Sequence, residues 1–163
     1  MLLGLSAVIV LSGCSGVVPM EAAANANDPR CADLTVRLPD EVADLKERST
    51  NAQATGAWGD PAGILLVCGI EPTGPTTLPC MTVDGVDWIR DDSRAPLFRF
   101  EAYGREPGVE VIIDADSGVS GTTALVDLNS AVSSIPQVRK CVGAEDTGAI
   151  PDNAEDGATV QVP

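Results

Sequence analysis

The sequence predicts an α+β fold: an antiparallel β-meander of four or five strands, with an N-terminal and a C-terminal helix packed on one face and two disulfides. Three observations support this prediction. Five short β-branched or aromatic runs are bounded by turn residues, helical apolar patterns precede and follow them, and four of the five cysteines follow an export signal. Of the 163 residues, 44% are apolar and 21% charged, the usual composition of a folded domain.

The first residues have the pattern of an export signal. Residues 2–11 form an apolar run that is too short for a transmembrane helix and typical of a signal-peptide core. The run ends in Leu11-Ser12-Gly13-Cys14, which resembles the lipobox of bacterial lipoproteins, whose cysteine is lipidated and becomes the first residue. We therefore expect a lipoprotein signal peptide over residues 1–13 and a lipidated Cys14, although no Lys or Arg precedes the apolar run.

Composition divides the remaining chain into three parts. Residues 14–30 are small, polar and unpatterned, which predicts a flexible tether after the lipidated cysteine. Residues 31–141 contain both Trp, both Phe, the Tyr and the other four cysteines, and are predicted to form the α+β domain. Residues 142–163 carry five acidic residues and no basic one, which predicts a disordered acidic tail.

The helical patterns flank the predicted sheet. Leu38, Val42 and Leu45 recur at helical spacing around Pro39, which suits a first helical turn. The C-terminal helix is predicted to begin at Ser120 or Thr122 and to stop at Pro136. Its apolar stripe consists of Leu125, Leu128, Val132 and Ile135.

The five predicted strands cover residues 64–70, 81–83, 86–90, 97–103 and 109–114. Asp84-Gly85 between the second and third predicts a two-residue hairpin turn with positive φ at both positions. Phe98 and Phe100 alternate with charged residues, so one face of the sheet is predicted to be apolar and the other solvated.

The four remaining cysteines are predicted to form two disulfides, because the predicted signal peptide would direct the chain to an oxidising compartment. We favour Cys31 with Cys141, which brackets the domain, and Cys68 with Cys80, which brackets a Pro-rich and Gly-rich loop. Sequence alone leaves all three pairings open. A four-thiolate zinc site is disfavoured because no C-x-x-C spacing occurs.

Charge and composition exclude several functions. The chain has 24 Asp plus Glu, 10 Lys plus Arg and no His, for a formal charge of −14. Binding to nucleic acid through a basic face is therefore not expected, and histidine-dependent catalysis is excluded. Residues 114–118 open like a calcium loop, but the positions of the glycine and of Leu125 depart from that motif and favour an acidic turn. No metal or cofactor is expected.

An aromatic and cationic group is the candidate binding site. Trp58, Trp88, Tyr103 and Arg105, with Asp87 beside them, have the chemistry to bind a sugar or peptide of the cell wall. The alternative is structural: both tryptophans fill the core, and Arg105 pairs with Glu110 or Asp87. A Trp88 that shares its sheet face with Phe98 and Phe100 would indicate the core role.

Several of these residues belong to a wider pattern. It comprises Trp58-Gly59-Asp60-Pro61, Cys68-Gly69, Gly85-Val86-Asp87-Trp88, Tyr103-Gly104-Arg105 with Pro107, Val109-Glu110-Val111, and the bracketing Cys31 and Cys141. With it, residues 31–141 resemble an actinobacterial lipoprotein family of unknown function, domain of unknown function 3515. Val67 stands where many members have Arg. The resemblance implies a cell-envelope location and an actinobacterial source, and it supplies no activity.

We therefore expect a non-catalytic accessory or binding module, lipid-anchored on the outer face of the cytoplasmic membrane. Its partners would be the membrane, through the anchor, and a cell-wall component or envelope protein, which an exposed sheet edge could recruit. The alternative is an envelope hydrolase that uses a carboxylate pair, Asp87 with Glu101 or Glu110.

Overall fold

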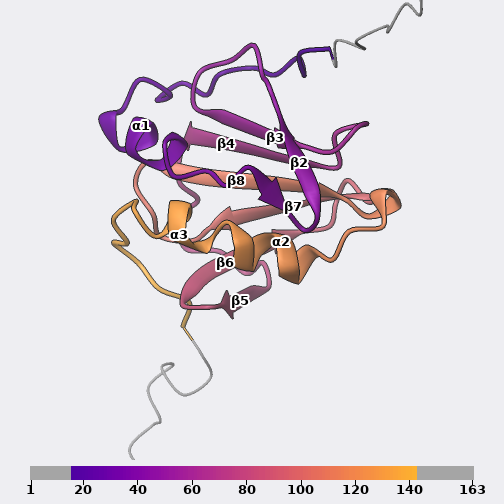
Figure 1. Ribbon diagram of the computed structural model, residues 1–163. Coiled ribbons are helices and arrows are strands. Elements are labelled where there is room, and N and C mark those ends of the chain that lie inside the picture. Colours follow the sequence, from indigo (N-terminus) through magenta and orange to yellow (C-terminus); the bar gives the residue numbers. More distant parts are fainter. Residues whose placement is uncertain (1–15, 143–163) are drawn as a thin grey trace, which may run out of the picture.

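The computed structural model describes residues 16–142 (Figure 1). Its elements are α1 (Pro29–Thr35), β1 (Glu41–Val42), β2 (Leu45–Arg48), β3 (Thr55–Trp58), β4 (Ile64–Ile70), β5 (Cys80–Val83), β6 (Val86–Asp91), β7 (Leu97–Ala102), β8 (Gly108–Asp114), the 3₁₀ turn η1 (Ala115–Ser117), α2 (Gly121–Asp127) and α3 (Asn129–Val132). No helix in this part of the chain is long and apolar enough to span a bilayer. The predicted signal peptide, Cys14 and the tail from residue 143 lie outside the described residues.

All strands belong to one antiparallel sheet with the order β1-β2-β3-β4-β8-β7-β6-β5. The sheet consists of two four-stranded meanders, β1 to β4 and β5 to β8, which join where β4 pairs with β8. The predicted α+β class and antiparallel sheet are confirmed. The predicted count of four or five strands is wrong, because the sheet has eight. The five predicted runs correspond to β4 through β8, and β1 through β3 were not predicted.

The predicted helix around residues 38–48 is wrong, because these residues form the β1–β2 hairpin. Ala43 and Asp44 have φ of 47° and 64°, the left-handed values of a tight hairpin turn. Glu41 lies opposite Lys46. The acidic and basic residues whose order favours a helix therefore also form a favourable cross-strand pair. The N-terminal helix lies upstream instead, as α1. The Asp28 side chain caps it by accepting a hydrogen bond from Arg30 N at 2.9 Å, and hydrogen bonds from Arg30 lower the pKa of Asp28 to about 2.

Residues 121–132 form two short helices, α2 and α3, in place of the one predicted helix. Ser120 caps α2 by accepting a hydrogen bond from Thr123 N at 3.3 Å. Figure 1 shows the helices along one face of the sheet. Between them and the strands lies the core, whose largest fully buried side chains include Trp58, Trp88, Leu66, Leu125, Leu128 and Ile135. Each such side chain contributes roughly 1.5–3 kcal/mol through burial.

The favoured disulfide pairing is wrong. The disulfides join Cys31 to Cys68 and Cys80 to Cys141. Cys68 points from β4 into the core, where α1 packs, so Cys31 is its neighbour. Cys80 begins β5, and hydrogen bonds to β6 hold the C-terminal segment beside it. The pairing thus depends on the sheet face or sheet edge on which each cysteine lies. The order of the cysteines in the sequence does not show this position.

The ordered domain extends upstream of residue 31, into the predicted tether. Val18 N donates to Ser49 O at 2.8 Å, and Asn25 N donates to Gly69 O at 3.0 Å. A Cβ added to Gly69 would lie 2.5 Å from Ala26 N. Residues 18, 25 and 26 therefore contact the sheet and the loop that follows β2.

We predict that native Cys80–Cys141 is reduced before Cys31–Cys68. Cys31 and Cys68 are fully buried, whereas Cys80 is exposed at the edge of the sheet, and thiol exchange requires access to a sulfur. A limiting dithiol reductant, alkylation and peptide mass spectrometry measure the order. Equal rates for the two bonds in folded protein would contradict it.

We also predict that Gly69→Ala destabilises the fold more than Gly85→Ala. Both glycines have positive φ, 100° and 80°, where a side chain costs about 1–2 kcal/mol. Only Gly69 also meets backbone atoms, those of Asn25 and Ala26, whereas the space around Gly85 is open. Urea unfolding compares the two variants. Equal losses would show that residues 25 and 26 do not pack tightly on β4.

Candidate functional site

Within residues 16–142, one face of the sheet is not covered by α1, α2 or α3, and we call it the open face. Along β6, β7 and β8, side chains alternate between the core and this face. Phe98 and Phe100 therefore enter the core, whereas Arg99 and Glu101 lie on the open face. The open face carries Asp87, Ile89, Asp91, Arg99, Glu101, Glu110 and Ile112.

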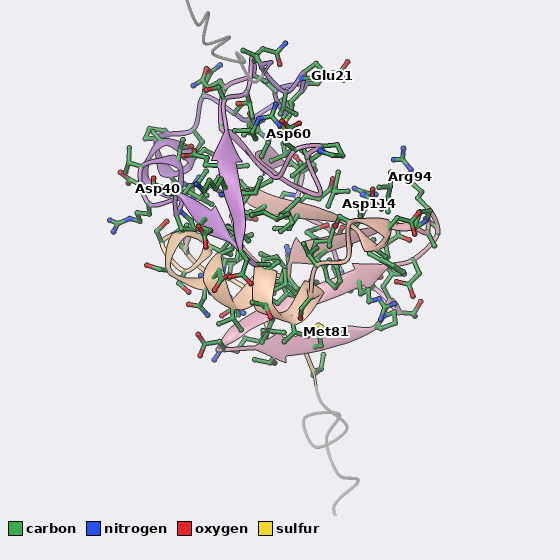
Figure 2. The ribbon with its side chains drawn as sticks, turned by 45° about the vertical axis from the view of Figure 1, so that its right-hand side comes forward. Glu21, Asp40, Asp60, Met81, Arg94 and Asp114 are labelled. Carbon is green, nitrogen blue, oxygen red and sulfur yellow. A yellow bond between two sulfur atoms is a disulfide. The ribbon has the colours of Figure 1, made fainter. Side chains whose placement is uncertain are left out.

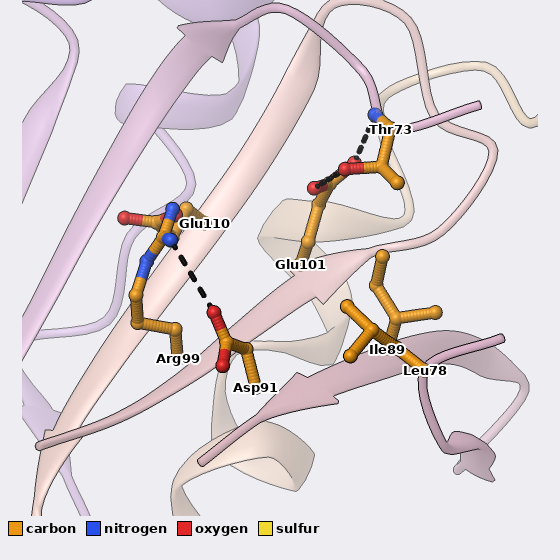
Figure 3. Close-up of a pocket in the computed structure, with 7 residues that line it drawn as sticks. All are labelled: Thr73, Leu78, Ile89, Asp91, Arg99, Glu101 and Glu110. Atoms are coloured by element: carbon orange, nitrogen blue, oxygen red, sulfur yellow. Dashed lines mark hydrogen bonds and ion pairs between the residues drawn. The ribbon is translucent and has the colours of Figure 1, made fainter. Parts of the chain in front are cut away.

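The open face contains a small pocket, which we call the open-face pocket (Figure 3). The loop of residues 71–79 folds back over β6 and β7 and closes one side of it. The pocket has a volume of about 90 Å³ and is lined by Thr73, Leu78, Ile89, Asp91, Arg99, Glu101 and Glu110. It thus combines three carboxylates and one guanidinium with two apolar side chains.

Glu101 holds the loop on the sheet. Its Oε1 accepts a hydrogen bond from Thr73 N at 2.7 Å, and its Oε2 accepts one from Thr73 Oγ1 at 2.6 Å. Figure 3 shows both bonds at the rim of the open-face pocket. These donors are neutral, so neither compensates the charge of Glu101.

Arg99 is shared by two carboxylates. Its Nη2 donates to the carboxylate of Glu110, and its Nη1 lies 3.7 Å from Asp91 Oδ2. Hydrogen bonds from Ser93, aided by nearby Arg99, hold the pKa of Asp91 below its ordinary value. Glu110 is only 7% exposed, so its charge lies largely out of solvent. With three carboxylates and one cation, the open-face pocket carries excess negative charge.

The two predicted tryptophans lie elsewhere, in the core. Both are fully buried, and the Trp58 indole donates from Nε1 to Pro39 O at 2.9 Å. Trp88 pairs with Ala102 on the face that also carries Phe98 and Phe100. This is the arrangement named above as the indication of a core role, so the tryptophans do not form an exposed patch.

Asp87 lies on the open face, but both oxygens of its carboxylate already accept hydrogen bonds. Its Oδ1 accepts from Thr82 Oγ1 at 2.7 Å, and its Oδ2 accepts from Gln137 Nε2 and Cys141 N, both at 3.0 Å. Its carboxylate thus fastens the C-terminal segment, residues 136–141, to the sheet.

Tyr103 and Arg105 lie against the same C-terminal segment. The buried Arg105 guanidinium donates from Nη1 to the carbonyls of Ser133 and Ile135, just beyond α3. Burial lowers the pKa of Arg105, while the nearby Asp87 charge opposes this change. Gly104 O accepts from Val138 N at 2.6 Å, and Tyr103 is 7% exposed. The structure therefore brings Asp87, Tyr103 and Arg105 together around a structural contact.

The open-face pocket was only partly visible in the sequence. The sequence suggests Glu101 and Glu110 as partners of Asp87, and the alternation in β7 predicts that Arg99 lies on the solvated face. Thr73 and Leu78 had no such signal, because only the folded loop brings them to the sheet. Residues 114–118 form an acidic turn in which Asp114 Oδ1 accepts from Asp116 N at 2.9 Å. Within residues 16–142, no group of three or more His, Cys, Asp or Glu is arranged to hold a metal ion.

We predict that Asp87→Asn lowers the free energy of unfolding by about 1–3 kcal/mol, because an amide offers one acceptor oxygen to three donors. Asp84→Asn is the matched control: Asp84 is exposed, and Asn tolerates its φ of 46°. The control should change stability by less than about 0.5 kcal/mol. Thermal and urea unfolding of both variants measure the difference, and a neutral Asp87→Asn would refute the anchoring role.

Comparison with known proteins identifies the family. No curated protein and no solved structure matches the chain. One family model does, over residues 8–140, and its description is "Protein of unknown function (DUF3515)". The match covers most of the chain and includes every strand and helix described above. The chain therefore belongs to the family of proteins of unknown function DUF3515.

Proposed function

We propose that this protein is a lipid-anchored, non-catalytic binding module on the outer face of the cytoplasmic membrane, and that the open-face pocket is its binding site. The lipobox at Cys14 and the even number of disulfide-bonded cysteines support an exported, anchored protein. The arrangement of Glu101 and Glu110 supports the binding site and carries the proposal.

Glu101 and Glu110 lie directly opposite each other on neighbouring strands. Two like charges in this position destabilise a sheet unless a cation lies between or beside them. Arg99 compensates Glu110, but it is shared with Asp91, and Glu101 has only the neutral donors of Thr73. A cation on the ligand would reduce the repulsion between Glu101 and Glu110. Binding of an ammonium or guanidinium group at this position is therefore favourable.

The size and walls of the open-face pocket limit the ligand further. A volume of about 90 Å³ is well below the roughly 300–1,000 Å³ of pockets that enclose whole small molecules. Leu78 and Ile89 supply an apolar wall beside the carboxylates. The pocket therefore suits one cationic side chain with an apolar stem, such as a lysine of an envelope peptide or protein.

The hydrolase alternative has less support. It requires Asp87 to exchange a proton with substrate or attack it, and three hydrogen bonds already occupy this carboxylate. Glu101 and Glu110 are the remaining opposed pair, and each is bound to a neighbouring side chain.

We predict that a lysine peptide binds the open-face pocket. The probe is an end-blocked Ala-Lys-Ala tripeptide, and the control is the same peptide with norleucine, which keeps the stem and lacks the charge. In a nuclear magnetic resonance titration of the isotope-labelled protein, the lysine peptide should shift the resonances of residues 89, 101 and 110.

Two matched variants test the charge. Glu101→Gln should weaken binding of the lysine peptide at least threefold, about 0.7 kcal/mol, and Glu21→Gln, an exposed glutamate outside the pocket, should leave it unchanged. Equal shifts by both peptides, or equal affinity of both variants, would refute a cation site. Hydrolysis of the probe that Glu101→Gln abolishes would favour the hydrolase.

A further inference from the structure

We propose that residues 16–20 fix the orientation of the domain on the membrane, so that one defined end of it rests against the lipid surface. This end, which we call the anchor end, consists of residues 16–20, 49–53 and 59–62. The inference rests on the proposed lipidation of Cys14 and goes beyond it, because a lipid anchor with a flexible tether would leave the domain free to rotate.

Backbone contacts hold the start of the ordered chain on the sheet. Val18 N donates to Ser49 O at 2.8 Å, and Val18 forms a parallel bridge with Thr50. Two residues later, Met20 N donates to Asn51 Oδ1 at 2.7 Å. Residues 18–20 thus run alongside the loop that follows β2.

Arg48 extends this attachment to Gly16. Its Nη2 donates to Gly16 O at 2.7 Å, and its Nη1 donates to Gly59 O at 2.9 Å and lies 2.9 Å from Asp60 Oδ1. The side chain is only 12% exposed, so these contacts are shielded from solvent. One guanidinium therefore joins the incoming chain to the turn after β3.

The covalent chain leaves little slack between this attachment and the lipid. Gly16 follows Cys14 by two residues, and an extended chain spans about 3.3–3.6 Å per residue, so their Cα atoms are at most about 7 Å apart. A flexible tether over residues 14–30 would instead reach roughly 20–25 Å. Acyl chains on Cys14 would therefore place Gly16 at the level of the lipid headgroups, beside the 56% exposed Val17.

The opposite end of the molecule would then face away from the bilayer. In Figure 1 the indigo start of the coloured chain lies at the top of the view, above β3, whereas the last coloured residues lie at the opposite end, near β5. Figure 2 shows Glu21 and Asp60 near the first of these ends and Met81 at the other. A partner in the cell wall would meet the β5–β6 hairpin before any other part of the domain.

Charge does not hold the domain on the membrane. The chain has a formal charge of −14, so an anionic bilayer repels it. The orientation must therefore come from the anchor and the contacts of residues 16–20, and added salt should not abolish it.

Fluorescence quenching on vesicles tests the proposal with the full lipidated chain. A fluorescent amino acid replaces Glu21, near the anchor end, or Asp84, at the tip of the β5–β6 hairpin, and the vesicles carry nitroxide on their headgroups. The label at position 21 should be quenched at least threefold more than the label at position 84, at low and at high salt.

Loosening the attachment should remove this difference. Arg48→Ala frees Gly16, and Arg94→Ala, an exposed arginine at which the same charge is lost, is the matched control. Arg48→Ala should bring the two labels to within about 1.5-fold of each other, a change that Arg94→Ala should not produce. Val18→Pro, which removes the N–H bonded to Ser49, repeats the test if Arg48→Ala does not fold.

The outcomes separate the two proposals. Protein without acyl chains on Cys14 by mass spectrometry, or protein that does not float with vesicles, overturns the lipid anchor and this inference together. Protein that is lipidated and floats, yet shows equal quenching at both positions, overturns the fixed orientation alone. A quenching difference that persists in both Arg48→Ala and Val18→Pro refutes the role of residues 16–20.

Discussion

The antiparallel pairing of β4 with β8 is the contact on which the rest of the structure depends. It joins two meanders that are separate in sequence. Because Ile64 lies beside Ile113 and Leu66 beside Val111, the apolar side chains of the two meanders form one continuous surface. The helices can bury their apolar sides only because this surface is continuous. On the other face, the pairing of β6 with β7 and of β7 with β8 aligns the polar residues that form the floor of the open-face pocket.

The residues on which the sequence resemblance rests serve the architecture. Trp58 and Trp88 fill the core, and Asp87 and Arg105 hold the C-terminal segment. Gly104 leaves room for the backbone of Arg139, with which an added Cβ would clash. Large side chains and buried charges are distinctive in sequence because few positions in a fold accept them. The open-face pocket instead uses ordinary surface residues, and its character comes from their arrangement.

The sequence correctly predicted the features that depend on residues close to one another in the chain. The strands β4 to β8 are rich in β-branched and aromatic residues, and Asp84-Gly85 has the positive φ values, 46° and 80°, that its turn requires. The β1–β2 hairpin was mistaken for a helix because Val42 and Leu45 are three residues apart, a spacing that both structures accept. β3 is not predicted because Gly56 and Ala57, at the centre of this strand, are poor strand formers, and pairing with β4 fixes the segment as a strand. Disulfide pairing and the position of loop 71–79 depend on which strands meet, and this information is distributed over the whole chain.

The placement of the disulfides has a consequence for assembly. Cys31–Cys68 lies within the half of the chain that ends with β4, and Cys80–Cys141 lies within the half that begins with β5. No disulfide crosses from one half to the other among residues 16–142, so only the backbone and noncovalent contacts join them. Two copies of the chain could therefore exchange halves and form a domain-swapped dimer without any thiol chemistry, whereas the favoured pairing of Cys31 with Cys141 would have forbidden it.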